Sequence, residues 1–174
     1  PPVYLHDAVA GTATRRRGAS LSLQSGRTLA PLGADTDTTL AIGLGSQVTV
    51  DPGQTIKLRG AGQITVLGGL TAAGGKIDIR QLRLGDIDVA DSVETADGQL
   101  HNRSIWIGER AVLDVAGRAQ SGIDAQGRRY GVADAGGVIV LGGEINHDRA
   151  TATAADAYVI VRPGAVLDAS GAAV

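Results

Sequence analysis

Short runs in which apolar and polar residues alternate recur along the chain. The first set comprises LSL at 21–23, LAI at 40–42, IKL at 56–58 and IDI at 77–79, with clusters of Gly, Pro, Asp or Ser between them. A period of two residues with such punctuation is typical of half-buried β-strands and not of helices. The sequence therefore predicts an all-β protein.

A second set of runs is interleaved with the first and follows one template. It comprises QVTV at 47–50, QITV at 63–66 and QLRL at 81–84. Two short strands in each period of roughly 20 residues are typical of a chain that winds into stacked turns. We predict a right-handed parallel β-helix, or β-solenoid, of about seven or eight coils, with the hand taken from the usual hand of parallel crossovers.

The template also predicts the direction of the side chains, because successive residues of a strand face opposite ways. The aliphatic positions would point inward: Val48, Val50, Ile64, Val66, Leu82 and Leu84. The glutamines would point outward in one column, where stacked amides can hydrogen-bond to one another: Gln47, Gln63 and Gln81.

Two nearly identical heptapeptides occur in the second half of the chain, AVLDVAG at 111–117 and AVLDASG at 165–171. The longer segments 104–119 and 158–173 share six identities in sixteen positions, and VIVLGG at 138–143 supplies another strand of the same kind. We interpret the echo as two coils of one solenoid and not as a duplicated active site. Asp114 and Asp168 would then bond local backbone amides at a corner, where the following Gly takes a positive φ.

The composition fits an interior built of equal layers, which Val, Ile, Leu and Ala alone can fill. The 174 residues include 26 Gly, one Trp and three Tyr, and no Phe, Met or Cys. This length suits a single β-helix domain over residues 1–174. Because the sequence opens on Pro1 and stops inside its own repeat, we expect a fragment of a larger repeat protein.

Charge and hydropathy argue against two classes of partner. The formal net charge is −2 and the charged residues are interspersed, so the basic stripe of a nucleic-acid-binding protein is missing. No apolar run approaches the roughly 20 residues that span a bilayer, so we expect no membrane insertion. The basic run Arg15, Arg16 and Arg17 is interpreted as a solvated turn.

Two polar, glycine-rich segments, 85–102 and 117–137, interrupt the repeat and are predicted to be insertions outside the helix. The second should form a small hairpin that turns near Gln126 and Gly127. Binding residues concentrate on loops carried by rigid scaffolds. The candidate contact residues at its tip are Arg128, Arg129 and Tyr130.

The predicted outward positions become apolar halfway along the chain. Early strands carry Thr49, Thr65 and Asp78, whereas the matching later strands carry Trp106, Ile139 and Ile160. Strands that are apolar on both faces are normally covered on both faces. We expect the chain's own insertion to cover this patch; the alternative is an exposed interaction surface in which these three later residues make the contacts.

Motifs that carry chemistry are missing from the sequence. His6, His101 and His147 lack metal-ligand spacing, and there is no P-loop, no GxSxG and no GxGxxG before a helix. We therefore predict no catalytic residue, no metal site and no cofactor. The alternative is a polysaccharide lyase or hydrolase built on a β-helix, and its candidate groups would be Asp78, Arg83, Asp86 and Asp88.

Three segments resemble the shaft of the filamentous-haemagglutinin-like exoproteins that Gram-negative bacteria export by two-partner secretion: SIWIGERAVLDVAGRA, GGVIVLGGEI and AYVIVRPGAVLDASGAA. The first half of the chain fits this family only through its period. The NPNG and NPNL motifs of the family's amino-terminal secretion domain are absent, so we expect a piece of the shaft and not of that domain.

The resemblance implies a large adhesin with a right-handed β-helical stem, secreted or attached to the bacterial surface. It implies export through the periplasm and through an outer-membrane pore-forming transporter partner, and a host-cell or bacterial surface receptor or glycan as the target. The family's shaft has no catalytic residues to transfer. A stalk that displays a distal toxin in contact-dependent inhibition is a further alternative.

Overall fold

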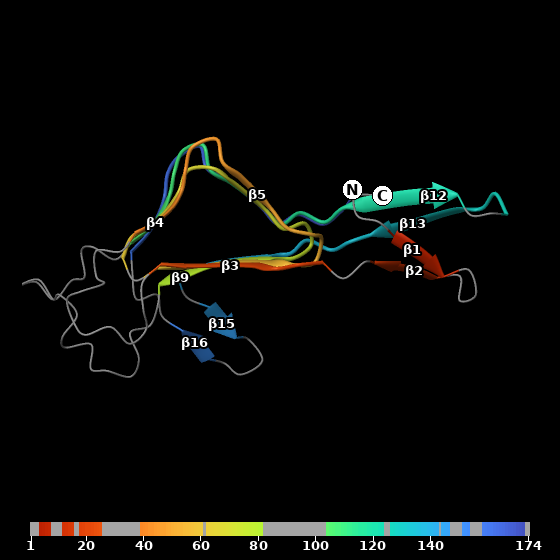
Figure 1. The fold of residues 1–174 in the computed structure, drawn as a ribbon, viewed down its shortest axis with the longest axis horizontal. Helices are drawn as coiled ribbons and strands as arrows, with labels where there is room; N and C mark the ends of the chain where they lie inside the picture. Colours follow the sequence, from red (N-terminus) through yellow and green to blue (C-terminus); the bar gives the residue numbers. More distant parts are fainter. Residues whose placement is uncertain are drawn as a thin grey trace, which may run out of the picture.

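The computed structural model describes residues 4–7, 12–15, 18–25, 39–60, 62–81, 104–123, 126–142, 144–146, 151–153 and 158–172. Within these ranges every regular element is a β-strand, which confirms the all-β prediction. Three parallel sheets of four strands each face a common apolar interior (Figure 1). None of the described residues belongs to a helix long and apolar enough to cross a bilayer.

The three sheets are named here by the order in which the chain meets them after β3. The first sheet contains β4 (Leu40–Ile42), β7 (Ile64–Val66), β10 (Ser104–Ile107) and β17 (Tyr158–Val161). The second sheet contains β5 (Gln47–Thr49), β8 (Gly69–Thr71), β11 (Val112–Asp114) and β18 (Val166–Asp168). The third sheet contains β3 (Leu21–Ser25), β6 (Thr55–Gly60), β9 (Lys76–Gln81) and β14 (Val138–Leu141).

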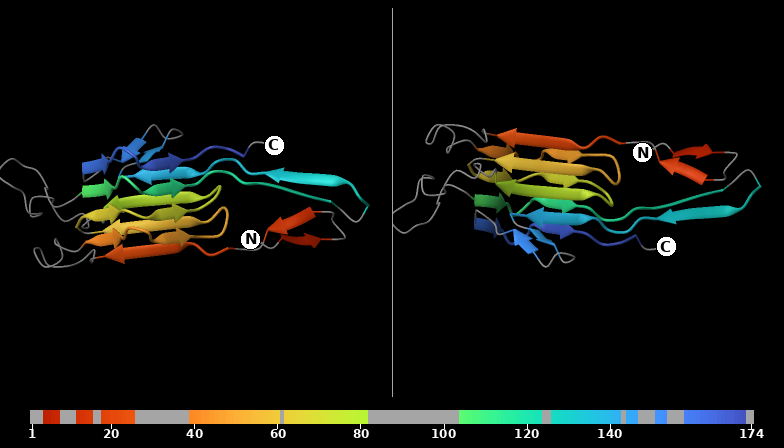
Figure 2. Two further views of the ribbon diagram at one scale, coloured as in Figure 1. Left: turned by 90° about the horizontal axis from the view of Figure 1, so that it is seen from above. Right: turned by 90° about the horizontal axis from the view of Figure 1, so that it is seen from below.

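Three antiparallel hairpins accompany the sheets: β1 (Tyr4–Asp7) with β2 (Thr12–Arg15), β12 (Ala119–Ile123) with β13 (Arg129–Ala133), and β15 (Glu144–Asn146) with β16 (Thr151–Thr153). The predicted turn at Gln126 and Gly127 is confirmed, since Gly127 lies between β12 and β13 with a φ of 76°. This hairpin projects well beyond the stacked strands (Figure 2).

The chain visits the first, second and third sheets in turn and then returns to the first. One turn without an insertion runs from Leu40 to its partner Ile64, and another from Ile56 to its partner Ile77. Each sheet is four strands deep in the described residues, so the predicted seven or eight coils are wrong there. Strands that the spacing assigned to separate coils are different sides of the same turn.

The interior consists of aliphatic columns that run from layer to layer. Ile56 pairs with Ile77, Ile64 with Ile105 and Leu70 with Leu113, and all six side chains are fully buried. Burial of one such side chain stabilises a fold by about 1.5–3 kcal/mol. The predicted inward direction is confirmed for Val48, Val50, Ile64 and Val66, whereas Leu82 and Leu84 lie outside the described residues.

The predicted glutamine column is wrong, because its three members belong to three different sheets. Gln47 lies in β5 of the second sheet, Gln63 precedes β7 of the first, and Gln81 ends β9 of the third. Gln81 is buried, and its Nε2 donates to the backbone oxygen of Ser104 at 3.3 Å. The template repeats at a shorter step than one full turn, so it joined positions on different sides.

The two similar heptapeptides, 111–117 and 165–171, lie in adjacent layers and in register, as predicted. Leu113 pairs with Leu167, and Asp114 pairs with Asp168 across parallel strands. The Oδ1 atom of Asp114 accepts from the amide of Ala116 at 2.9 Å, and that of Asp168 accepts from the amide of Ser170 at 2.9 Å. Both carboxylates therefore set a corner, as predicted.

The glycine that follows each of these corners acts differently from the prediction. Neither Gly117 nor Gly171 has a positive φ. A Cβ atom at Gly117 would instead overlap the backbone oxygen of Asp134. Close approach between neighbouring backbones, and not an unusual backbone conformation, explains the glycine at position 117.

A candidate binding groove on the first sheet

The outer face of the first sheet carries the chain's single tryptophan. One outward row runs through the four layers as Ala41, Thr65, Trp106 and Ile160, because these residues are partners in register. The predicted change from polar to apolar side chains holds in this row from Thr65 to Trp106 and Ile160, whereas the first member, Ala41, is apolar as well. The structure thus brings two of the predicted contact residues, Trp106 and Ile160, side by side.

The third member of the predicted apolar patch, Ile139, lies elsewhere and faces the other way. It pairs with the fully buried Ile77 in the third sheet and packs against the core. The partner of Asp78 is the next residue, Val140. A slip of one residue in the sequence alignment reversed the face, since the side chains of a strand alternate.

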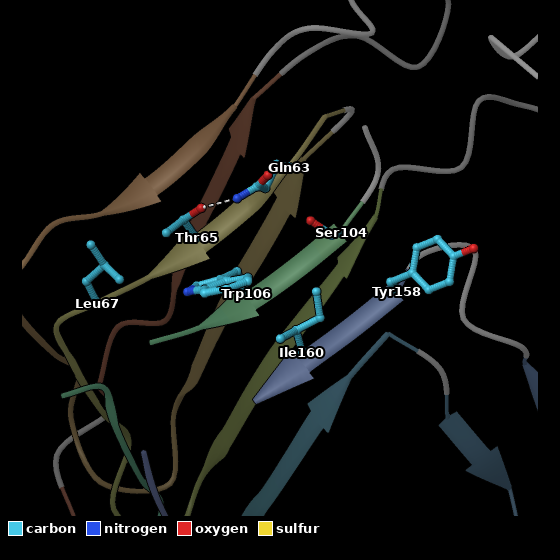
Figure 3. A pocket seen from close by; sticks show the side chains of 7 residues that line it. All are labelled: Gln63, Thr65, Leu67, Ser104, Trp106, Tyr158 and Ile160. Carbon is cyan, nitrogen blue, oxygen red and sulfur yellow. Dashed lines mark hydrogen bonds between the residues drawn. The ribbon is translucent and has the colours of Figure 1, made fainter. Parts of the chain in front are cut away.

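A groove of about 510 Å³ lies over this row (Figure 3). Its lining side chains come from β7, β10 and β17 and the residues beside them: Gln63, Thr65, Leu67, Ser104, Trp106, Tyr158 and Ile160. Along β10 and just beyond it, every second residue reads Ser104, Trp106 and Gly108, so a large ring stands between two small residues. This contrast in size leaves open space beside the indole.

Arg162 lies against the tryptophan ring. Its guanidinium carbon is 5.5 Å from the ring centroid, and its Nη2 contacts Glu109 Oε1 at 3.0 Å. Both charged side chains are exposed, so their ion pair adds little stability. A cation over a half-buried indole such as that of Trp106 contributes at least about 0.5–1 kcal/mol, which helps to hold the ring in place.

The polar side of the groove is also ordered. Gln63 Nε2 donates to Thr65 Oγ1 at 2.9 Å, which fixes the plane of the amide. Ser104 is buried at the base of the groove, between Gln63 on one side and Tyr158 on the other (Figure 3). Sequence reasoning missed Gln63 and Ser104, because only the register across layers places them beside Trp106.

The β12–β13 hairpin holds the remaining predicted contact residues. Arg128 and Arg129 are exposed there, and Tyr130 belongs to β13, while its side chain lies outside the described part. The hairpin projects on the side of β5, away from the first sheet (Figure 1). The structure therefore does not bring these residues to Trp106, and this hairpin does not cover the groove. Segment 85–102, the other expected cover, lies outside the described residues.

Asp78, a candidate of the enzymatic alternative, is held in a structural charge cluster. It is only 4% exposed, and its carboxylate contacts Arg59 at 2.9 Å, Arg80 at 2.8 Å and Lys76 at 3.5 Å. The register places Lys57 opposite Asp78 and Arg59 opposite Arg80, which alternation within one strand could not reveal. Arg83, Asp86 and Asp88 lie outside the described residues.

Asp168 shows a perturbed acidity with a local cause. The backbone and side-chain hydrogen bonds of Ser170 lower the pKa of the Asp168 carboxyl, and the charge of Arg118 acts in the same direction. Arg118 itself contacts Asp114 Oδ2 at 2.6 Å. These groups stabilise a corner between layers. In the described part of the chain no cluster of three or more His, Asp or Glu is placed to hold a metal ion.

A second depression, of about 740 Å³, lies where the second and third sheets meet. Its lining includes Ser20, Thr49, Asp51, Thr71 and Arg118. Asp51 Oδ2 accepts from the amide of Ala19 at 3.2 Å, which ties the start of β3 to the following layer. Its lining has no aromatic side chain, so the Trp106 groove is the stronger candidate site.

No family model, no curated protein and no solved structure matches this chain. Its function is therefore inferred from its own residues and their arrangement.

Proposed function

We propose that this chain is a shaft segment of a large secreted or surface-attached bacterial exoprotein of the filamentous-haemagglutinin type, with a structural and adhesive role. The three sheets would be the sides of a right-handed, closed parallel β-helix. One observation carries the proposal: the two copies of the echo stack in register, Leu113 on Leu167 and Asp114 on Asp168. A fold that adds equal layers along one axis is suited to extend over a long distance and to present binding surfaces.

Export by two-partner secretion is consistent with the composition. The 174 residues contain no cysteine, so no disulfide would hinder the threading of the chain through a pore. Each layer contacts its neighbouring layers, so layers can form one after another as the chain emerges. We propose an outer-membrane pore-forming transporter as the partner of the full-length protein, and a route through the periplasm to the surface of a Gram-negative cell.

The adhesive part of the proposal rests on two features that the core does not require. The Trp106 groove places an aromatic ring on an outer face, and the β12–β13 hairpin presents Arg128 and Arg129 away from the sheets. Rigid scaffolds acquire binding functions through loops and outer positions that can vary without disturbing the interior. The target would be a receptor or glycan on a host or bacterial surface.

The parent open reading frame tests the export class directly. We expect an amino-terminal secretion domain in the same frame and a neighbouring gene for a pore-forming transporter. A frame without either would contradict the proposed export. A toxin domain downstream would instead favour the stalk that serves contact-dependent inhibition.

Binding of the purified protein to epithelial and bacterial cells tests the adhesive role. We expect saturable binding that decreases when residues 119–135 are deleted or when Trp106 is replaced by Ala. No binding to any cell surface would leave only the structural role.

The carbohydrate-active alternative loses one of its candidate groups, because Asp78 is buried and contacts three cations. A screen of acidic and neutral polysaccharides would test the other candidates. Release of products that disappears in Asp86→Asn or Asp88→Asn would support an enzyme over a shaft.

A further inference from the structure

We propose that the groove beside Trp106 binds a neutral hexopyranose unit of a glycan, an inference that rests on the adhesive part of the proposed function and gives it a ligand class. The groove has the size of a small-molecule site, since its volume of about 510 Å³ falls within the usual range of roughly 300–1,000 Å³. Its shape and its chemistry both favour a sugar ring.

The shape comes from three adjacent strands. Ser104 on β10 pairs with Tyr158 on β17, and Gln63 lies on the other side, one residue before β7. Because the serine side chain is short and its neighbours are long, a hollow opens over Ser104 with Trp106 as its third wall (Figure 3). A single ring can enter this hollow and lie against the face of the indole opposite Arg162.

The lining combines an aromatic ring with groups that both donate and accept hydrogen bonds. The face of an indole is electron-rich, and the C–H bonds on one face of a pyranose ring carry a small positive charge, so the two faces attract. The amide of Gln63 and the hydroxyl of Ser104 match sugar hydroxyls, which also donate and accept, whereas the Tyr158 ring points away from Trp106 (Figure 3). The hydrogen bond from Gln63 Nε2 to Thr65 Oγ1, at 2.9 Å, fixes the orientation of the amide before a ligand binds.

The charges around the groove favour a neutral ligand. None of the seven lining side chains is charged. Arg162 borders them, but its guanidinium lies over the Trp106 ring and contacts Glu109 at 3.0 Å. A uronic acid or sulfated sugar would have to compete with Glu109 for this cation, whereas a neutral hexose requires no counter-charge.

Other occupants fit the same surface less well. An extended peptide binds by strand addition only at an unpaired edge, so in the described sheet it could pair with the edge strand β17 but not between β7 and β10, which have partner strands on both sides. An apolar helix would cover the polar groups of Gln63 and Ser104 and would offer them no further hydrogen bonds. A nucleic acid needs several cations to neutralise its phosphates.

The single tryptophan makes the test specific, because its fluorescence reports on this groove alone. The purified chain is titrated with maltohexaose, cellohexaose and a β-1,4-galactan oligosaccharide, and with oligogalacturonate as the charged counterpart. We expect a saturable change in emission with at least one neutral oligosaccharide. The variant Ser104→Val fills the hollow and keeps the tryptophan, so it should weaken binding by about tenfold or more, as the loss of a central contact does.

Calorimetric titration of Trp106→Ala should show the same loss, and Gln63→Ala a smaller one. Val138→Ala, at an exposed position of β14 in the third sheet, is the matched control and should bind as the unchanged chain does. Far-UV circular dichroism and the melting temperature establish that each variant is folded. If Trp106→Ala does not fold, Ser104→Val and Gln63→Ala decide the question.

Two results would overturn the inference and leave the adhesive function intact: cell binding without any effect of the neutral oligosaccharides, or sugar binding that is unchanged in Ser104→Val and Trp106→Ala. Binding of oligogalacturonate alone would also overturn it. If neither sugars nor cells are bound, the adhesive part of the proposed function fails together with this inference.

Discussion

Replacing Leu113 and Leu167 by Ala, one at a time, compares the same interior position in two successive layers. Leu113 is fully buried and lies in register between Leu70 and Leu167. Leu167 belongs to the last described layer of the second sheet and is 42% exposed. If layers stack as described, the two substitutions should differ in their effect on stability although their chemistry is identical.

The magnitudes follow from burial. Leu113→Ala removes a side chain enclosed on both sides and leaves a cavity, which should destabilise the fold by about 3–4 kcal/mol. Replacing Leu167 costs less free energy of unfolding, because this side chain is already 42% exposed and the space that it leaves is open to solvent. Leu167→Ala should therefore destabilise by about 1–1.5 kcal/mol. The expected difference is about 2 kcal/mol.

Urea unfolding, followed by Trp106 fluorescence and by far-UV circular dichroism, gives the free energies of unfolding. Coincident transitions with the two probes show that layers unfold together and that one free energy describes them. An equal or larger loss in Leu167→Ala than in Leu113→Ala would refute the layered assignment, as would losses below about 1 kcal/mol in both, because neither position would then be an interior column.

Three further predictions follow from the same structure. Asp78→Asn leaves Arg59 and its neighbouring cations without their buried counter-charge, so it should lower the free energy of unfolding in urea by about 3 kcal/mol. An unchanged free energy of unfolding would contradict this assignment. Gly137→Ala should lower the melting temperature more than Gly127→Ala does. A Cβ at position 137 would overlap a neighbouring carbonyl oxygen, whereas a Cβ at position 127 would lie in open space, so that only the positive φ of that residue is unfavourable. The reverse order of melting temperatures would contradict the described packing. The carboxyl of Asp168 has a pKa below its ordinary value of 3.8, so its contribution to stability is present above pH 3.8 and is lost as the pH falls through the lowered pKa. The free energy of unfolding of Asp168→Asn should therefore lack this decrease at low pH. A decrease of the same size in the variant would show that another group causes it.

The sequence predicts the kind of element well and the neighbours of each element less well. Alternation identified the strands at 21–23, 56–58 and 77–79, which pair in one sheet. The same alternation occurs in all three sheets, so the spacing between two runs cannot distinguish the next side of a turn from the next turn. Gln47 and Gln63 were joined for this reason, although they belong to different sheets.

A long echo, by contrast, does identify adjacent layers. Segments 111–117 and 165–171 differ only at their fifth and sixth positions, and such a match arises when both segments meet the same corner and the same columns. The step between layers varies because loops of different length intervene: it is shorter from Ile64 to its partner Ile105 than from Ile105 to its partner Val159.

The candidate site could be predicted only where the repeated segments identify adjacent layers. Trp106 and Ile160 stand at equivalent places in the two halves of the echo, so their adjacency could be inferred. Gln63 and Ser104 reach the groove through a register that depends on loop length, and sequence spacing does not fix that length. Ile139 was placed on the wrong face because its alignment slipped by one residue.

Engineered disulfides test the central claim, that successive turns stack in parallel register, most directly because the chain has no cysteine of its own. Val112 and Val166 are in-register partners and both are exposed. Adjacent strands lie about 4.8 Å apart, within the Cα separation of a disulfide, whereas a partner shifted by two residues lies roughly 8 Å away. We predict that Val112→Cys with Val166→Cys oxidises readily to a cross-linked monomer on a non-reducing gel, and that Val112→Cys with Asp168→Cys does not. Faster cross-linking of the shifted pair, or none in the in-register pair, would contradict the stacking.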